Sequence, residues 1–290
     1  MTIQNVVANT IAVCLLGGFS LGSAIAATAA DPAGTTKLTA AQIVERNVAA
    51  RGGLEAWRRV QSISMAGKMD AGKLREPYQV RGPSRKQGAR AQTVSSGAGA
   101  NADVGKTIQL PYVMELQRPH KMRVELVFKD ETAVQVYDGV NGWKLRPYLG
   151  RKDVDPYTAE ELKTAAEQQE LDGPLINYAA KGTKVALAGI EPVEGRDAYK
   201  LKLTLKGGQV RHVWVDKQTF LDVKMDGAPR RLDGKPHAVA IYLRDYKSVD
   251  GLMIPHLLET TVQGVKDSQT LTIERVALNP KLEEARFAKP

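Results

Sequence analysis

The sequence predicts a mainly β (α+β) protein: a curved antiparallel sheet of about ten strands, with helices that act as a lid or plug. Over Lys121–Phe128, apolar and polar residues alternate, which is the period-two pattern of a strand with one buried and one solvated face. Asp-Gly, Asn-Gly and Gly-Gly steps follow such stretches at short intervals and allow the chain to reverse. Short turns between successive strands favour an antiparallel meander.

Two helices are expected ahead of the first strand. Thr39 and Gln42 have the spacing of a capping box, and an apolar stripe that begins at Ile43 follows them. A second short helix over residues 54–60 carries Trp57. It either plugs the mouth of the curved sheet or packs on the sheet as an ordinary helix, and the sequence leaves both interpretations open.

The middle of the chain holds an insertion and a third helix. Residues 71–106 are rich in Gly, Ser, Ala and basic side chains, with little apolar surface to offset chain entropy. We expect a mobile basic excursion between two paired strands, or alternatively an arm that lies on a membrane surface. Thr158 and Glu161 form a second capping box before a helix of about fourteen residues, whose thin apolar face suits a lid.

The N-terminus has the features of an export signal. Residues 1–30 carry no charged side chain, residues 11–19 are almost wholly apolar, and small residues follow. This pattern predicts a signal peptide over 1–30 and a single domain over 31–290. A retained membrane anchor is the alternative, although the glycines and serines of this segment make a poor spanning helix. Export to a bacterial periplasm, in a Gram-negative-type envelope, is the simplest fit.

The cysteine content limits the chemistry that the chain can perform, and the net charge indicates which surfaces it can bind. Cys14 is the only cysteine and lies within the signal segment, so the mature chain offers no thiolate nucleophile and no cysteine metal ligand. Lys and Arg number 41 against 32 acidic residues, a net charge of +9. This excess favours anionic surfaces such as phospholipid headgroups or lipopolysaccharide. Nucleic acid is the least expected of these partners for an exported protein.

Catalytic and metal-binding motifs are missing from the sequence. The four histidines are far apart, and neither a His-Glu-x-x-His nor a Gly-x-Ser-x-Gly motif is present. We therefore expect a non-enzymatic protein with no catalytic residue, no metal and no cofactor. A pair such as Asp245 with His256 could still meet in space, which keeps a hydrolase as an alternative.

The predicted sheet has an apolar face that is larger than two helices of modest length can cover. Part of the inner face then either forms a cavity for an apolar guest or is filled by the protein's own side chains. The residues expected to line the cavity are bulky and apolar: Trp57, Met65, Met122, Val124, Leu126, Trp143, Leu201, Leu203, Val223, Met225 and Ile241.

Several short motifs, spread over residues 39–290, resemble those of periplasmic lipoprotein carriers of the LolA/LolB superfamily. They are an Arg-Pro step, an Asp-Gly turn followed by an aromatic residue, and a C-terminal tail: Arg118-Pro119, Asp138-Gly139 with Gly142-Trp143, and Asn279-Pro280 with Phe287 to Pro290. The resemblance implies an unclosed β-barrel, or half-barrel, with a helical lid over an apolar cavity that holds acyl chains.

The resemblance also implies a role for Arg118. In the carriers, an arginine before a proline holds the lid closed through hydrogen bonds to backbone carbonyls, and Arg118 occupies the matching step. It is otherwise a surface arginine at a strand edge. The implied function is a monomeric carrier that takes lipoprotein acyl chains from an inner-membrane donor toward an outer-membrane acceptor. The alternative within this superfamily is a regulator or scaffold that senses lipid or lipoprotein.

Overall fold

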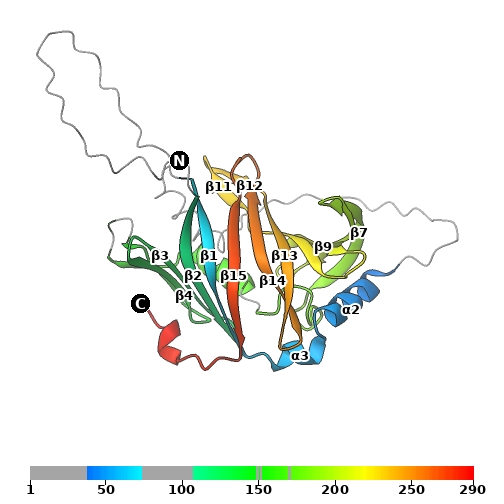
Figure 1. Ribbon diagram of the computed structural model, residues 1–290, viewed down its shortest axis with the longest axis horizontal. Coiled ribbons are helices and arrows are strands. Elements are labelled where there is room, and N and C mark those ends of the chain that lie inside the picture. Colours follow the sequence, from blue (N-terminus) through cyan, green and yellow to red (C-terminus); the bar gives the residue numbers. More distant parts are fainter. Residues whose placement is uncertain (1–37, 74–106, 148–149, 151, 169–170) are drawn as a thin grey trace, which may run out of the picture.

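The computed structural model describes residues 38–73, 107–147, 150, 152–168 and 171–290 (Figure 1). Its first meander contains β1 (Ser62–Lys73), β2 (Thr107–Gln117), β3 (Lys121–Phe128), β4 (Glu131–Tyr137), β5 (Gly142–Leu145) and β6 (Val154–Pro156). The second contains β7 (Lys184–Val193), β8 (Arg196–Thr204), β9 (Val210–Asp216), β10 (Asp222–Asp226), β13 (Val239–Val249), β14 (Leu252–Val262) and β15 (Gln269–Leu278).

One 13-stranded antiparallel sheet joins the two meanders, in the order β6-β5-β4-β3-β2-β1-β15-β14-β13-β10-β9-β8-β7. The pairing of β1 with β15 joins them, with Ile63 opposite Leu278. Two short strands, β11 (Arg230–Leu232) and β12 (Lys235–His237), form a separate hairpin. The sheet is curved and unclosed, so the predicted fold class is confirmed. The described strands outnumber the predicted ten, in part because β6, β11 and β12 have three residues each, too few to show alternation.

The unclosed sheet forces one long crossing of the chain. Strands β6 and β7 are consecutive but lie at opposite edges of the sheet. Helix α4 (Ala159–Gln168) and residues 171–183 make this connection, and Ala165 and Ile176 from it are buried against side chains of the first meander. The crossing segment therefore covers part of the face on which those side chains lie, which we call the inner face.

Helix α2 (Ala40–Ala50) covers the inner face of the second meander. The capping box predicted at its start is present: Gln42 N donates to Thr39 Oγ1, and Thr39 N donates to Gln42 Oε1. Ile43 and Val44 are buried against a cluster that includes Leu201 and Val213.

A buried amide fastens α2 to the sheet. Asn47 is fully buried and donates from Nδ2 to Phe220 O at 2.7 Å and to Asp222 Oδ1 at 3.0 Å. Burial raises the pKa of Asp222, against the opposing effects of Arg51 and Asn47. Buried polar groups are costly without partners, so these bonds fix the position of α2.

Helix α3 (Leu54–Arg59) follows directly and closes one end of the first meander. Trp57, which is 2% exposed, packs with Met65, Leu116 and Met122 and donates from Nε1 to Arg51 O. Figure 1 shows α2 and α3 together at the same end of the long central strands. Both helices expected ahead of the first strand are thus confirmed, and α3 packs into the end of the curved sheet.

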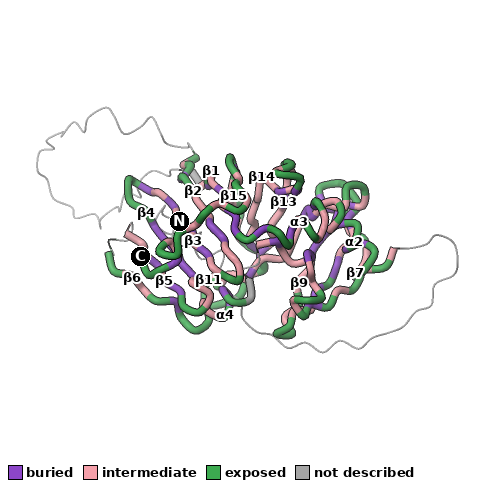
Figure 2. The backbone as a smooth tube through the Cα atoms, turned by 90° about the horizontal axis from the view of Figure 1, so that it is seen from below, coloured by how far each residue is buried: buried purple, intermediate pink, exposed green. Residues whose placement is uncertain are grey.

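The outer face of β3, β4 and β5 is covered by the C-terminal segment. Phe287, in the 3-10 turn η3 (Glu284–Phe287), is 1% exposed and packs with Val134, Val136 and Trp143. Figure 2 shows the resulting contrast along the sheet: β4 is buried on both faces, whereas the edge strand β7 is mostly exposed.

Two expectations fall wholly or mainly on residues outside the described part of the chain. The signal peptide over 1–30 lies outside it, and so does the basic insertion apart from residues 71–73, which extend β1. The strands that flank the insertion do pair with each other, with Met69 opposite Leu110. Among the described helices, none has the length and apolar character needed to cross a membrane.

Candidate functional site

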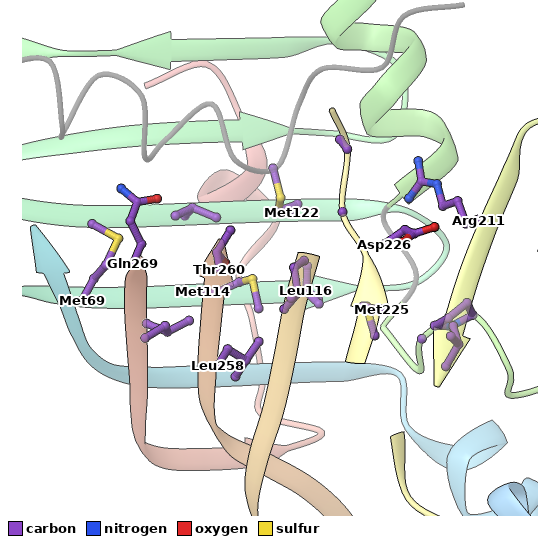
Figure 3. Close-up of a pocket in the computed structure, with 18 of the residues that line it drawn as sticks. Met69, Met114, Leu116, Met122, Arg211, Met225, Asp226, Leu258, Thr260 and Gln269 are labelled. Carbon is purple, nitrogen blue, oxygen red and sulfur yellow. The ribbon is translucent and has the colours of Figure 1, made fainter. Parts of the chain in front are cut away.

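A cavity of about 390 Å³ lies on the inner face, between the two meanders and the crossing segment. Its walls come from β1 to β4 on one side and from β8, β9, β10, β13, β14 and β15 on the other (Figure 3). Gly173, Pro174 and Thr183 of the crossing segment complete the wall. Such a volume falls within the usual range of small-molecule sites, roughly 300–1,000 Å³.

Four methionines contribute to this lining. Met69, Met114, Met122 and Met225 reach the cavity from β1, β2, β3 and β10. They converge because side chains two residues apart on a strand share a face, and the register places Met114 opposite Val124, another lining residue. Unbranched, polarisable methionine side chains adapt to guests of variable shape.

Polar side chains also reach the wall, among them Gln135, Thr260 and Thr270. In Figure 3, Arg211 and Asp226 lie at one end of the cavity and Gln269 lies at the other. Asp226 Oδ2 accepts the backbone N–H of His212 at 2.9 Å and lies 2.8 Å from His212 Nδ1. The lining is therefore mostly apolar, with charged groups at one end, which suits a long apolar group.

Six of the eleven residues that the sequence assigns to a cavity line this one. They are the inner-face residues of β3, β8, β10 and β13: Met122, Val124, Leu126, Leu203, Met225 and Ile241.

Three of the remaining residues lie in the packed regions at helices α2 and α3. Trp57 and Met65 belong to the cluster at α3, and Leu201 belongs to the cluster at α2. Their side chains contribute to the packed regions on either side of the cavity. For these residues the filled-core alternative describes the structure better than the cavity.

Trp143 and Val223 lie on the other face of the sheet. Trp143 is opposite Val136, and both pack against Phe287 on the outer face. The register of β10 shifts between Asp222 and Lys224, so Val223 packs with Trp214 rather than with the cavity. A bulge of this kind moves a side chain to the opposite face, which alternation alone does not reveal.

Arg118 joins the strand end to the covering elements. Its Nε donates to Val60 O at 2.9 Å, and its Nη2 approaches Trp57 O at 3.5 Å. Its Nη2 also forms an ion pair with Asp172 Oδ2 at 2.7 Å. Carbonyl contacts of the type implied by the resemblance are therefore present, together with a carboxylate on the crossing segment.

Asp172 is the centre of this network, which we call the Asp172 latch. Its Oδ1 accepts from Lys181 Nζ at 2.6 Å, and its backbone carbonyl accepts from Arg51 Nη1 at 2.9 Å. Burial raises the pKa of Asp172, but the ion pairs and hydrogen bonds with Lys181 and Arg118 outweigh it and leave the pKa below its usual value. The carboxylate therefore stays ionised at neutral pH.

The latch was not predicted from the sequence. Asp172 is visible there only as part of an Asp-Gly-Pro helix stop, and Lys181 has no motif around it. Their meeting with Arg118 depends on the path of the crossing segment, which is a long-range feature.

The histidine and carboxylate considered for hydrolysis have separate partners. His256 is buried, with Nδ1 3.0 Å from Ile254 O. Asp245 is half-exposed and pairs with Lys247 Nζ at 3.0 Å. Within the described residues, no group of three or more His, Cys, Asp and Glu side chains is placed to hold a metal ion.

No family model matches the sequence, and no curated protein matches it. Among solved structures, a DUF1329 family protein from Desulfovibrio piger has a similar fold, with a TM-score of 0.51 and 14% identity over 86% of this chain and 97% of that one. A LolA superfamily protein from Nitrosomonas europaea has a TM-score of 0.48 and 15% identity, over 87% of this chain and 99% of that one.

A putative outer membrane lipoprotein-sorting protein domain from Vibrio parahaemolyticus has a TM-score of 0.47 and 15% identity, over 85% of this chain and 95% of that one. The Desulfovibrio piger structure shows that the unclosed sheet occurs in another protein over nearly its whole length.

Proposed function

We propose that this chain is a non-enzymatic carrier that shields the alkyl chain of a lipid or lipoprotein in its central cavity. It would work in the bacterial periplasm and pass its cargo toward the outer membrane. One observation carries the proposal: an apolar cavity of about 390 Å³, rich in methionine, on the inner face of the sheet.

The size and lining of the cavity favour an alkyl guest. An apolar cavity of roughly 150 Å³ accommodates benzene, so this one has room for a longer apolar chain. Removing a dodecyl chain from water is worth roughly 9 kcal/mol at about 0.8 kcal/mol per methylene. Part of this offsets the lost freedom of the guest, so micromolar affinity is the expected outcome.

We assign to the Asp172 latch the control of guest entry into the cavity and guest release from it. Arg118 holds the carbonyl of Val60 at the end of α3, and through Asp172 it also holds the crossing segment. Gly173 and Pro174, the next two residues of that segment, line the cavity. Breaking the contacts of this guanidinium group would loosen the wall, which Arg51 and Lys181 also hold at Asp172, so we assign Arg118 the role of gate.

Binding of dodecanol to the purified chain tests the carrier directly. We expect a micromolar Kd by calorimetry and a complex of one dodecanol per chain by native mass spectrometry. Met225→Trp fills the cavity and should weaken binding more than tenfold. Ile190→Trp, at a 51% exposed position of β7, is the control and should bind as the parent does.

Equal dodecanol binding by Met225→Trp and the parent would contradict the cavity as the site.

A second experiment distinguishes a carrier from a sensor. It measures the transfer of lipoprotein from inner-membrane to outer-membrane vesicles. Binding without transfer, together with one stable protein partner, would favour the lipid- or lipoprotein-sensing regulator over the carrier.

A further inference from the structure

A second cavity, of about 420 Å³, lies beside the first and is rich in cations. Arg58, Arg118, Lys121 and Lys181 line it, whereas Asp172 is the only carboxylate among its described lining residues. Four positive side chains around one negative side chain are an unusual concentration for a pocket. They make a site that favours an anion.

The two cavities share a wall. Leu116 borders both of them, and Asp172 borders the second while the adjoining Gly173 and Pro174 border the first. A molecule whose alkyl chain occupied the first cavity could therefore reach the second with its head once the Asp172 latch had opened.

Two of the cations are held by contacts that an anion could replace at little cost. Arg58 and Lys121 form ion pairs with Glu55 and Glu284, whose side chains are 73% and 72% exposed. Exposed pairs of this kind contribute little to stability.

The two remaining cations, Arg118 and Lys181, share the single carboxylate of Asp172, at 2.7 Å and 2.6 Å. Among the described residues, none accepts a hydrogen bond from Arg118 Nη1. A guanidinium group binds phosphate oxygens through a pair of parallel hydrogen bonds, which gives the ligand direction as well as charge.

We propose that this second cavity binds the phosphate headgroup of an amphiphile whose alkyl chain occupies the first cavity. The Asp172 carboxylate occupies the phosphate position in the closed state. This inference rests on the proposed function and adds the class of headgroup to it. A phosphate group offers more acceptor oxygens than a carboxylate, so it can engage Arg118 and Lys181 together with Arg58. Its binding releases Asp172 and so couples headgroup recognition to opening of the crossing segment.

Arg58 and Arg59 provide a matched test, because they are adjacent in α3 and only Arg58 lines the cavity. The ligands are dodecyl phosphate, dodecanol and inorganic phosphate, each titrated into the parent, Arg58→Gln and Arg59→Gln. We expect the parent to bind dodecyl phosphate about tenfold more tightly than dodecanol, as one charge-assisted hydrogen bond or more would give. Arg58→Gln should lose most of this preference, whereas Arg59→Gln should keep it.

A second variant distinguishes competition from a structural role. Asp172→Asn removes the competing charge, so we expect the preference for dodecyl phosphate over dodecanol to rise severalfold. A purely structural Asp172 would instead weaken both ligands together when it is replaced.

The headgroup proposal is overturned if dodecyl phosphate and dodecanol bind equally well and Arg58→Gln behaves as Arg59→Gln does. It is also overturned if inorganic phosphate binds as tightly as dodecyl phosphate, because the pocket would then take a free anion. Failure of dodecanol alone to bind would count against the proposed carrier function and not against the anion site, which the dodecyl phosphate and inorganic phosphate titrations test separately.

Discussion

The two faces of strands β2, β3 and β4 are covered in different ways. On the outer face, the C-terminal segment packs Phe287 against Val134 and Val136. On the inner face, Met114, Val124 and other side chains of the same strands border a cavity. One face is thus completed by the protein itself, and the other leaves room for a guest.

Polar contacts strengthen the closure of the outer face. Arg286 donates to Glu115 Oε2 at 2.8 Å and to Glu125 Oε1 at 3.1 Å, and its carbonyl accepts from Arg123 Nη1 at 2.9 Å. The crossing segment over the inner face buries Leu175 and Ile176, and one of its polar anchors, Asp172, lies next to the cavity. The difference lies in what is beneath each cover: packed side chains on the outer face, and in part a cavity on the inner face.

The largest effect is expected on the outer face. Phe287→Ala should lower the free energy of unfolding by about 3–5 kcal/mol, because it removes a fully buried aromatic ring. The dodecanol affinity of the folded fraction should stay within about twofold. Urea unfolding and calorimetry measure the two quantities.

Val140→Ala is the control for this change, since Val140 is 75% exposed and should tolerate truncation within about 0.5 kcal/mol. Equal stabilities of Phe287→Ala and Val140→Ala would show that the packing of the C-terminal segment on the outer face does not stabilise the fold.

At Arg118, the proposed gate, we expect a smaller effect on stability and a clear effect on the rate of dodecanol release. Arg118→Leu removes hydrogen bonds to Val60 O and Asp172, and the side chain is 31% exposed, so we expect a loss of about 1 kcal/mol. Dodecanol should leave severalfold faster, while its Kd should change less. Stopped-flow release measures the rate, and release at the parent rate would show that Arg118 is not a gate.

The latch should also make stability depend on pH. The pKa of Asp172 is lowered in the folded state, so its ion pairs stabilise the fold above the unfolded value of about 3.9. This contribution is lost as the pH falls through the lower folded pKa. The parent should therefore exceed Asp172→Asn by about 1 kcal/mol at pH 7, and the gap should shrink toward pH 3. A gap that is constant over this range would contradict an ionised latch.

The smallest effect is expected inside the cavity. Met114→Leu conserves volume on a wall that is not tightly packed, so stability should change by less than about 1 kcal/mol. Dodecanol affinity should change by less than about threefold. Thermal unfolding and calorimetry check both values. A loss of several kcal/mol would mean that the inner face is packed as densely as the outer one.

Local patterns predicted much of the fold. The capping box at Thr39 and the alternation of β3 both have the structure that their residues predict. Alternation shows that a strand has two different faces, but it does not show what covers each face. Trp143 illustrates the limit: it is apolar and follows a turn, yet its face was decided by the C-terminal segment, more than a hundred residues away.

The candidate site was less predictable than the fold, for two physical reasons. The bulge near Val223 shifts one residue to the opposite face without a recognisable sequence signal. The Asp172 latch depends on a segment that crosses between the two edges of the sheet, so its partners are distant in sequence. Arg118 was identified because its Arg-Pro step resembles that of a known family, whereas Asp172 and Lys181 have no such motif.

Methyl NMR of the methionines tests the inner cavity most directly, because Met69, Met114, Met122 and Met225 line it while Met65 and Met253 do not. With carbon-13 in the methionine methyl groups, dodecanol is titrated into the full chain. We predict that the four cavity resonances shift or broaden in proportion to occupancy, and that the resonances of Met65 and Met253 change far less. Saturable binding that leaves the four cavity resonances in place would contradict a guest chain in this cavity.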